Sequence, residues 1–553
     1  RSGERLAALD PTSAMLRGAL GGAVVSASTA TAGSSGGYLN FASLLEFDWQ
    51  VAIGNTRMSV AEFKKTVRRL RGVVKLNDEY VLLDDRELQS LMKKLEKPPA
   101  LKPQDILQAA LSEDYDGARV ALGQKATTLM RQIREELPVA LPKELKAVLR
   151  PYQLRGYRWM YKNSRLGFGS LLADDMGLGK TLQVIALLEK AREEGSLEQY
   201  PALVVVPTTL LNNWEREIAR FAPGLSAMVY HGPKRQLPED GRQVVLTSYG
   251  VARSDADKLA RRKWGFLVID EAQNIKNTKT EQTKAIKKIK ASIRVAMSGT
   301  PVENRLSEYW SIFDYTNKGY LHSLAQFKKA YILPIEKDRD QQQLDRFRKV
   351  TAPFILRRLK SDKSIIKDLP EKVENDQFCY LTPEQAGLYQ NVLRKSLNGL
   401  EEEEGMNRRG LIFTMMTSLK QICNHPGHFL KHKDIDPALS GKMQVLFTLL
   451  DNIWESNEKT LIFTQYRQMG DLLQQVIADR YGQQPLWLHG GSTRKGRDQM
   501  VQDFQGKNHL KFMLLSLKAG GTGLPSGHCV MVSQTTSLPQ SDLTLSPTIL
   551  STK

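Results

Sequence analysis

Cysteine is scarce in this sequence, and it contains no long apolar run. The 553 residues include only three cysteines, Cys379, Cys423 and Cys529, which are widely spaced and form no CxxC pair. This usage argues against a disulfide scaffold and against a zinc ribbon, and it fits a reducing compartment. No uninterrupted apolar stretch reaches the length of a membrane span, so we expect neither a transmembrane segment nor a membrane partner.

Acidic residues are outnumbered by basic ones. Against 79 Lys and Arg there are 60 Asp and Glu, which gives a formal net charge of +19. Such an excess indicates a polyanionic partner, most often nucleic acid. The chain is also too long for one hydrophobic core, so we expect three or more domains.

One glycine-rich stretch carries the clearest chemical signal. It lies between an apolar strand at 171–173 and a helix whose apolar residues recur at helical spacing as far as Gly195. Such a loop turns backbone N–H groups toward an anion, and the helix adds the positive end of its dipole. We expect it to bind ATP, with Lys180 at the outer phosphates and Thr181 on Mg2+. The alternative is a glycine turn that opens an ordinary helix. The predicted phosphate-binding residues are Asp175, Met176, Gly177, Leu178, Gly179, Lys180 and Thr181.

The phosphate-loop pattern is not matched at every position. The general form has glycine where this chain has Asp174, so only the Gly-Lys-Thr end is diagnostic.

From about residue 140 the sequence alternates between strands and helices, which predicts a parallel sheet covered on both faces. Ligands of open parallel sheets bind beyond the carboxyl ends of the strands. The hydroxyl and acidic residues that follow four of these strands should therefore line one crevice with the phosphate loop. The strands and the residues that follow them are 203–206 with Thr208, 244–246 with Ser248, 266–269 with Asp270 and Glu271, and 295–297 with Ser298 and Thr300.

Asp270 and Glu271 supply the second half of the expected chemistry. An acid directly after a buried strand can bind Mg2+, usually through water, and we assign this role to Asp270. Its neighbour Glu271 is placed to orient and deprotonate the water that attacks the γ-phosphate. The alternative is an acidic turn that caps the next helix.

Together these motifs resemble the Swi/Snf-type ATPases, a family of the helicase superfamily with two RecA-like lobes. The resemblance covers about residues 148–524. Lobe 1 is matched by LRPYQLRGYRWM, ADDMGLGKT, LVVVPTTLLNNWEREI, VVLTSYG, DEAQ and MSGTPVENRLSEYWSIFDY. Lobe 2 is matched by SGKMQVL, TLIFTQY, LHGGSTRKGRDQMVQDF and LLSLKAGGTGL. Residues 354–374 and 419–429 resemble the helical insertions that separate this family from ordinary helicases.

The resemblance implies an ATP-driven translocase that tracks along double-stranded DNA and displaces bound protein, with RNA polymerase as one candidate partner. It further implies that Gln153 reads adenine and that Ser298 and Thr300 couple hydrolysis to lobe movement. Hydroxyls and lysines would hold the DNA backbone without reading sequence. These DNA-contacting residues would be Thr208, Ser248, Ser492, Thr493, Ser516 and Lys518. A catalytically impaired DNA-binding remnant and a strand-separating helicase remain alternatives.

The expected fold is α/β, with two RecA-like parallel-sheet lobes, helical insertions and a small α+β N-terminal domain. The N-terminal domain resembles the accessory domain of bacterial members, with strands at 73–76 and 80–83 and helices at 60–70 and 87–95. A bacterial member would be cytoplasmic and associated with the nucleoid. The predicted divisions are a flexible segment 1–40, an accessory domain 41–139, lobe 1 at 140–325, a helical insertion region 326–438, a partial lobe 2 at 439–524 and an aberrant tail 525–553.

The tail departs from the family after Gly523. The family would continue with another buried strand and then a helix with two arginines that reach the γ-phosphate, whereas the last arginine here is Arg497. Because an arginine finger can contribute about a thousandfold to turnover, we expect this polypeptide to bind ATP and hydrolyse it slowly.

Two further groups of residues have a structural and a functional interpretation. Cys423, His425 and His428 are cramped for a metal site, and packing in the helical insertion is the preferred interpretation. The lysines of KAIKKIK, residues 284–290, could touch DNA or form a solvated helix face.

Overall fold

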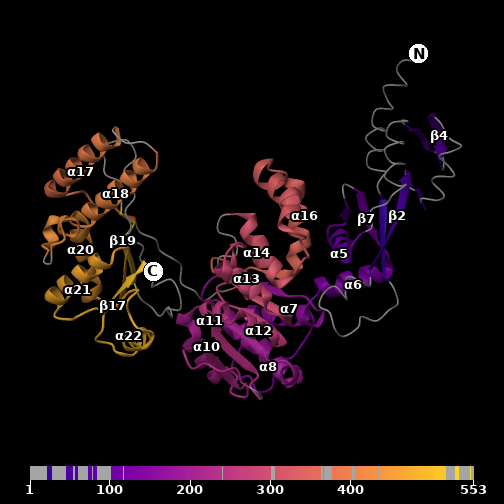
Figure 1. Ribbon diagram of the computed structural model, residues 1–553, viewed down its shortest axis with the longest axis horizontal. Coiled ribbons are helices and arrows are strands. Elements are labelled where there is room, and N and C mark those ends of the chain that lie inside the picture. The colour runs from indigo at the N-terminus through magenta and orange to yellow at the C-terminus, as the bar shows by residue number, and fades with distance from the viewer. Residues whose placement is uncertain are drawn as a thin grey trace, which may run out of the picture. The chain divides into compact units, whose positions relative to one another are not determined.

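The structure is a computed structural model, and it divides into two compact units, Arg1–Lys367 and Asp368–Lys553 (Figure 1). None of the helices in the described part of the chain is long and apolar enough to cross a membrane. The residues that it describes are 22–27, 45–53, 56–59, 72–76, 79–83, 101–115, 118–238, 241–299, 305–362, 365, 376–401, 405–432, 435–517, 530–534 and 548–549.

The first unit begins with a five-stranded sheet in the order β3-β2-β1-β7-β6. Strand β1 is antiparallel to β2 and parallel to β7. This finding corrects the flexible segment expected over 1–40, because Val24 and Val25 give β1 the β-branched character of a strand. The strands are β1 Gly22–Ala27, β2 Leu45–Ile53, β3 Thr56–Ser59, β6 Asp114–Tyr115 and β7 Ala118–Leu122.

The two short strands predicted for the accessory domain are confirmed. They are β4 Gly72–Leu76 and β5 Glu79–Leu83, which pair antiparallel. The helices expected at 60–70 and 87–95 lie outside the described residues. Helices α5 Pro103–Ser112 and α6 Gln124–Arg134 complete this part of the unit.

Helix α5 also contacts the rest of the first unit. Asp105 lies 2.8 Å from His322 Nε2, and the Tyr331 hydroxyl donates to Gln108 Oε1 at 3.3 Å. Burial raises the pKa of the Asp105 carboxyl, but the hydrogen bonds from His322 and from the Lys102 N–H outweigh this effect and hold the pKa below its usual value. Helix α5 therefore joins the accessory part to the rest of the first unit through these polar contacts and through Leu107, which lies in the same apolar cluster as Phe347.

The centre of the first unit is a seven-stranded sheet in the order β10-β11-β9-β12-β13-β8-β14. Every pair in it is parallel, as the sequence predicts. Its strands are β8 Ser170–Leu172, β9 Ala202–Val206, β10 Ala227–Tyr230, β11 Val244–Ser248, β12 Trp264–Ile269, β13 Ala291–Met297 and β14 Ile355–Leu356.

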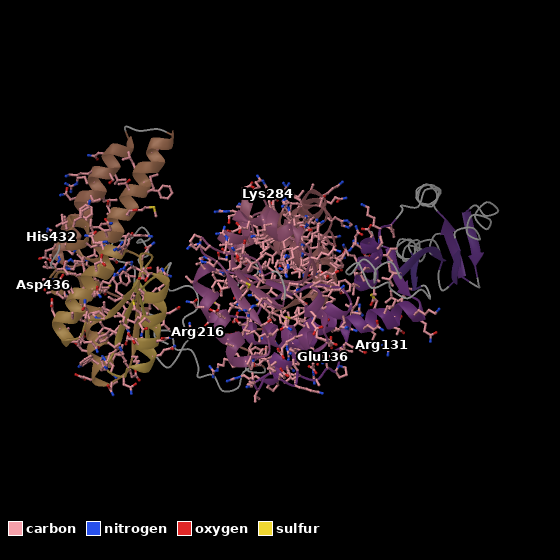
Figure 2. The ribbon with its side chains drawn as sticks, turned by 60° about the horizontal axis from the view of Figure 1, so that its bottom comes forward. Arg131, Glu136, Arg216, Lys284, His432 and Asp436 are labelled. Carbon is pink, nitrogen blue, oxygen red and sulfur yellow. The ribbon has the colours of Figure 1, made fainter. Side chains whose placement is uncertain are left out.

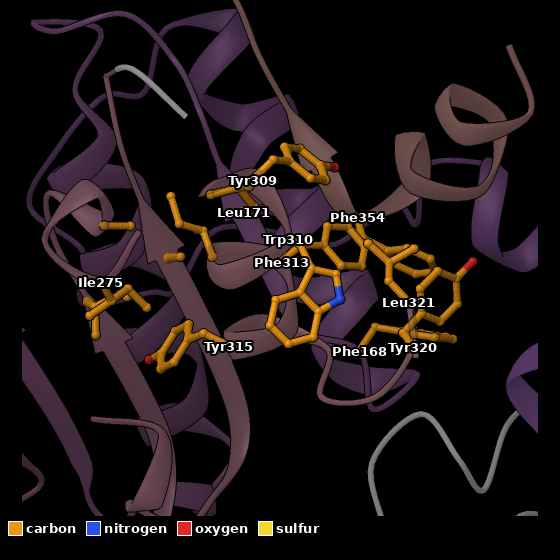
Figure 3. Close-up of a cluster of buried hydrophobic side chains, with 14 of the residues drawn as sticks. Phe168, Leu171, Ile275, Tyr309, Trp310, Phe313, Tyr315, Tyr320, Leu321 and Phe354 are labelled. Carbon is orange, nitrogen blue, oxygen red and sulfur yellow. The ribbon is translucent and has the colours of Figure 1, made fainter. Parts of the chain in front are cut away.

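Two separate apolar clusters cover the two faces of this sheet. Leu171 and Leu203 belong to one cluster, while their neighbours Leu172 and Val204 belong to the other. Figure 3 shows the first cluster, in which Phe313 and the rings around it pack beside the sheet. Successive side chains of a strand point to opposite faces, so strands buried on both faces must be apolar throughout.

Helices surround this sheet (Figure 1). Gly195, with φ +74°, follows the end of α8 where the sequence predicts a helix stop. The helices are α7 Pro151–Arg165, α8 Lys180–Glu193, α9 Ser196–Gln199, α10 Leu211–Phe221, α11 Tyr249–Ser254, α12 Ala256–Arg261, α13 Glu281–Lys288 and α14 Leu306–Thr316.

Lobe 1 continues past its predicted boundary at residue 325. After α15 Leu324–Phe327, the π-helical segment Lys328–Lys337 and α16 Gln341–Thr351, the chain returns to the sheet as β14. Phe354, just before β14, packs in the core against Phe168 with ring centroids 4.5 Å apart (Figure 3). The predicted insertion region therefore begins with residues that belong to the first core.

The second unit combines a pair of long helices with a four-stranded parallel sheet in the order β17-β18-β16-β19. Helices α17 Pro383–Glu401 and α18 Gly405–Asn424 fall inside the predicted helical region. The other elements are α19 Pro426–Leu430, α20 Gly441–Glu455, β16 Thr460–Thr464, α21 Arg467–Tyr481, β17 Leu486–Leu488, α22 Arg494–Gly506, β18 Phe512–Ser516 and β19 Val530–Gln534.

Strand β19 corrects the predicted end of lobe 2 at residue 524. It pairs in parallel with β16 over five residues, Val530 to Gln534, and so adds an edge strand to the sheet. Its valines favour a strand, although it lies in the stretch assigned to an aberrant tail. Further along, β20 Thr548–Ile549 pairs antiparallel with β15 Asp376–Gln377.

Candidate active site

The parallel sheet brings the predicted strand ends together. Neighbours β8, β13 and β12 end at Leu172, Met297 and Ile269, one beside the next. The Ser298 N–H donates to the Leu172 carbonyl at 3.1 Å, which joins the residue after β13 to the strand that enters the phosphate loop. The expectation that these strand ends lie side by side is thus confirmed for this part of the sheet.

The phosphate loop turns at two glycines. Gly177 and Gly179 have φ values of +81° and +71°, a left-handed conformation that favours glycine. Lys180 begins α8, and its ammonium donates to the carbonyls of Asp174 at 2.7 Å and Asp175 at 3.2 Å. Burial lowers the pKa of Lys180, and the nearby Asp270 opposes that shift. Thr181, half-buried, follows in the first turn of α8.

Asp174, which stands at the glycine position of the general pattern, has a partner that the sequence did not reveal. Its fully buried carboxylate accepts from Arg358 Nε at 2.9 Å and from the Arg358 terminal nitrogen. Arg358 also donates to Gln183 Oε1 at 2.9 Å and to the Tyr152 carbonyl. The arginine therefore joins the start of the loop to helices α7 and α8. Its partner lies 184 residues away, so only a family-wide pattern could have signalled this pair.

Gln153 lies against the back of the loop. Its side-chain amide donates to the Leu178 carbonyl at 3.2 Å, and its Oε1 accepts from the Arg150 N–H at 2.9 Å. A Cβ atom added to Gly179 would lie 2.3 Å from Gln153 Nε2, so this close approach and the positive φ both favour glycine. Two other residues of the predicted loop differ in exposure. Leu178 is fully buried, whereas Met176 is 49% exposed.

The acid pair lies at the end of β12 within electrostatic reach of Lys180. Asp270 is 7% exposed, and its two oxygens accept from Trp214 Nε1 at 2.9 Å and from the Glu271 N–H at 2.8 Å. Glu271 has φ +51°, an uncommon conformation for a residue other than glycine. Strain of this kind is often kept at functional positions.

A chain of side-chain hydrogen bonds runs from the acid pair to Ser298. Gln273 Nε2 donates to Glu271 Oε2 at 2.8 Å, and the Ser298 hydroxyl donates to Gln273 Oε1 at 3.0 Å. Sequence reasoning named both ends of this chain and missed Gln273 between them. It could have been found in the DEAQ motif, whose last residue is Gln273.

The donor set fits Mg2+ bound together with a nucleotide. Mg2+ commonly takes one or two protein oxygens together with waters and substrate phosphates. Asp270 and Thr181 supply carboxylate and hydroxyl oxygen beside the loop. No cluster of three or more His, Cys, Asp or Glu suited to a metal occurs among the residues the structure describes, so an all-protein cage is not what this site offers.

The acid pair predicts a pH dependence. Burial, with repulsion from Glu271, raises the pKa of Asp270 to about 6, whereas Trp214 lowers it. Because only the ionised carboxylate binds Mg2+, we expect kcat/KM for ATP hydrolysis to fall as the pH drops through about 6. The folded state holds this proton more tightly than the unfolded state, so the contribution of Asp270 to stability increases over the same drop.

Trp214→Phe is the matched variant for this prediction. It removes the hydrogen bond that lowers the pKa of Asp270, so the acidic limb of the pH profile should move to higher pH. An unchanged limb in Trp214→Phe would show that another group sets the profile.

The predicted DNA-contacting residues have different environments. Thr208 is exposed at the start of a short 3-10 helix, as a backbone contact requires. Ser248 is 2% exposed, and its hydroxyl accepts from the Val251 N–H as the cap of α11.

In the second unit Thr493 caps α22 while remaining exposed, and the Ser492 hydroxyl accepts from the His489 N–H. Ser516 ends β18, while Thr300 and Lys518 lie outside the described residues.

The lysines of helix α13 face acidic partners. Lys284 projects from the surface (Figure 2), where it pairs with Glu281 at 2.8 Å. Lys287 pairs with Asp314 at 2.8 Å, and Lys288 with Asp257. These pairings favour the structural interpretation of the basic run over DNA contact.

The Cys423 region is packed as the sequence analysis preferred. The His425 ring accepts from the Gly427 N–H at 2.9 Å, and its other nitrogen bonds to the Asp436 carbonyl at 2.8 Å. His428 packs edge-on against Tyr466, and burial lowers the pKa of His428 to about 4. Backbone groups therefore hold His425, and packing against Tyr466 holds His428, which favours the packing interpretation.

The phosphate loop, the acid pair and the two parallel sheets define a P-loop protein with two RecA-like lobes. The chain belongs to the SNF2 family, because the family described as SNF2-related domain matches residues 152–428, half of the chain. The family described as Helicase conserved C-terminal domain matches 441–541, which includes β19. The family described as SNF2 Helicase protein matches 15–111, which overlaps the expected accessory domain.

Individual relatives show the same likeness. YwqA of Bacillus subtilis, provisionally named an ATP-dependent helicase/translocase, is 38% identical over 88% of this chain and 56% of its own length. An uncharacterised ATP-dependent helicase of Mycoplasma genitalium is 34% identical over 68% of this chain and 36% of its own. The chain thus spans about half or less of these relatives. The Sulfolobus solfataricus SWI2/SNF2 ATPase core in complex with dsDNA is 36% identical, over 72% of this chain and 91% of that one, with a TM-score of 0.43.

Proposed function

We propose that this chain hydrolyses ATP to move along double-stranded DNA and displace bound protein. The observation that carries the proposal is that Lys180, at the start of α8, lies within electrostatic reach of Asp270 and Glu271, which follow β12 in the same sheet. This is the set of groups that phosphoryl transfer requires: a cation for the outer phosphates, a metal-binding acid and a water-orienting base. The net charge of +19 supports binding to a polyanion such as DNA.

The proposed steps use the residues of this chain. The loop N–H groups and Lys180 hold the phosphates, and Gln153, which bonds to the Leu178 carbonyl of the loop, is the residue assigned to the adenine base. Glu271 accepts the proton of the attacking water, and its bond from Gln273 fixes the direction of the carboxylate. Mg2+ held by Asp270 and Thr181 would offset phosphate charge when bound.

The test of the proposal is ATPase activity with and without duplex DNA. Slow hydrolysis that increases with duplex DNA, displacement of a third strand from a triplex and no separation of the duplex are expected for a translocase. A strand-separating helicase would unwind the duplex. A DNA-binding remnant would bind DNA without stimulated hydrolysis, and this outcome would overturn the proposal.

The protein that is displaced is a finer part of the proposal. RNA polymerase stalled on DNA is one candidate, and a nucleoid-associated location would suit it. Release of a stalled complex by this chain with ATP, and its retention with a non-hydrolysable analogue, is the expected result.

The Ser298 hydroxyl should couple hydrolysis to DNA. Ser298→Ala removes the last link of the chain to Glu271 through Gln273 and leaves the acids in place. We expect DNA-independent hydrolysis to persist while DNA stimulation falls by roughly fivefold or more. The ratio of the two ATPase rates measures this effect, and Glu271→Gln should instead lower both rates. An unaltered ratio in Ser298→Ala would refute the coupling role.

A further inference from the structure

The segment that leaves the sheet after β14 runs along the phosphate loop. The Ala173 N–H donates to the Leu356 carbonyl at 2.7 Å, and the Asp175 N–H donates to the Arg358 carbonyl at 3.0 Å. The Lys360 N–H then donates to Asp175 Oδ2 at 2.9 Å. Alternate residues of the segment therefore bond to the loop, as in a parallel ladder, and they fix the segment beside the predicted phosphate position.

The Lys360 side chain lies beside Gly177 of the phosphate loop. A Cβ atom added to Gly177 would lie 2.9 Å from Lys360 Nζ and 3.3 Å from Lys360 Cε. Gly177 is the left-handed glycine at which the loop turns its backbone toward an anion. Lys360 is exposed, so its ammonium can move toward an arriving anion without leaving a buried position.

Arg358 makes this position well defined. The guanidinium is 7% exposed and is tied to the fully buried Asp174 and to Gln183. Because Lys360 is only two residues further on, a fixed Arg358 limits where its backbone can lie. A preorganised cation loses less conformational entropy when it binds a ligand than a free one does.

The local charge balance favours a second cation. Lys180 has four carboxylates within electrostatic range, those of Asp174, Asp175, Asp270 and Glu271. Arg358 neutralises Asp174. A nucleotide would add phosphate charge to this acidic surrounding, so a further ammonium at the loop would lower the cost of binding.

We propose that Lys360 is a second cationic ligand for the phosphates of the bound nucleotide. The inference rests on the proposed function, since it assigns a further residue to the same ATP site. Lys180 approaches the phosphates from the start of α8, whereas Lys360 approaches from the segment after β14. The two lysines thereby hold the phosphates from two separate parts of the first unit.

The experiment compares nucleotide affinity of the full 553-residue chain and its variants by calorimetry, with ADP and a non-hydrolysable ATP analogue. Lys360→Met keeps most of the length of the side chain and the backbone bond to Asp175. It should weaken both ligands by roughly tenfold, the size expected for a lost charge-assisted contact. Lys360→Arg should retain most of the affinity. Arg357→Met, which removes an exposed charge from the same segment, is the matched control and should bind as the unmodified chain does.

A structural role is separated by thermal unfolding. Without nucleotide, Lys360→Met should melt at the same temperature as the unmodified chain, and its stabilisation by the ATP analogue should be smaller. A lower melting temperature without nucleotide, combined with unchanged affinity, would overturn the inference.

The outcomes distinguish the inference from the function on which it rests. If Lys180→Ala abolishes binding while Lys360→Met binds normally, the ATP site stands and the role of Lys360 is refuted. Equal weakening by Lys360→Met and Arg357→Met would show a general charge effect and would also refute it. If the unmodified chain binds neither ligand, the proposed function itself fails.

Discussion

ATP hydrolysis by Lys180→Ala should be lower by roughly a hundredfold to a thousandfold, the range measured when one group that stabilises developing charge is removed. The Lys180 ammonium donates to the Asp174 carbonyl of the loop and interacts electrostatically with Asp270 and Glu271. In phosphoryl transfer the protein acts mainly by positioning and by electrostatic stabilisation, so this cation has a large share of the effect. The measurement is steady-state ATPase activity with saturating duplex DNA.

Folding should not suffer from this change. Burial lowers the pKa of Lys180, which means that the folded state disfavours its charged form. Removing the ammonium therefore should leave the unfolding midpoint unchanged or slightly raised. Lys190→Ala is the matched control, because Lys190 lies in the last turn of the same helix and pairs with Glu193 at 3.4 Å. A Lys180→Ala protein with full DNA-stimulated activity would show that ATP is hydrolysed elsewhere.

Arg358→Met should destabilise the first unit by about 3–5 kcal/mol, the cost of leaving a buried charge without its partner. Asp174 is fully buried, and Arg358 also donates hydrogen bonds to Gln183 Oε1 and to the Tyr152 carbonyl. The measurement is the urea midpoint of the transition followed by the tryptophans of this unit. Nucleotide affinity should fall as well, because the loop loses its anchor.

Two further variants test the cause of this destabilisation. Arg357→Met removes a neighbouring exposed charge and should change stability by less than about 0.5 kcal/mol. Adding Asp174→Asn to Arg358→Met should recover part of the loss, because the unpaired buried charge is then gone. A midpoint for Arg358→Met equal to that of the unmodified chain would contradict the anchoring role.

The elements predicted most accurately are those whose signal is local. Strand β9 is uniformly apolar because both of its faces are buried, and α8 begins at Lys180 and stops before Gly195. Once these strands are known to be parallel, the side chains after them must meet at one edge of the sheet. The sequence alone therefore assigns Asp270 and Ser298 to one site.

Tertiary context gives other residues a role that the local sequence did not predict. Strands β1 and β19 lie in stretches that read as a flexible segment and an aberrant tail, and pairing with neighbouring strands makes them part of sheets. Ser248 has the residue type of a DNA contact, yet the turn into α11 uses its hydroxyl as a cap. A side chain's local role depends on which backbone groups remain unpaired around it, and the sequence does not state this.

The sequence by itself determined the loop, the acid pair and the parallel order that joins them, because hydrophobic periodicity and backbone geometry act over a few residues. Only the tertiary structure decided that Asp174 is neutralised by Arg358 and that Lys360 lies over Gly177. These contacts join residues that lie far apart along the chain. No local pattern encodes them, since they form only when β14 pairs with β8 at the edge of the sheet.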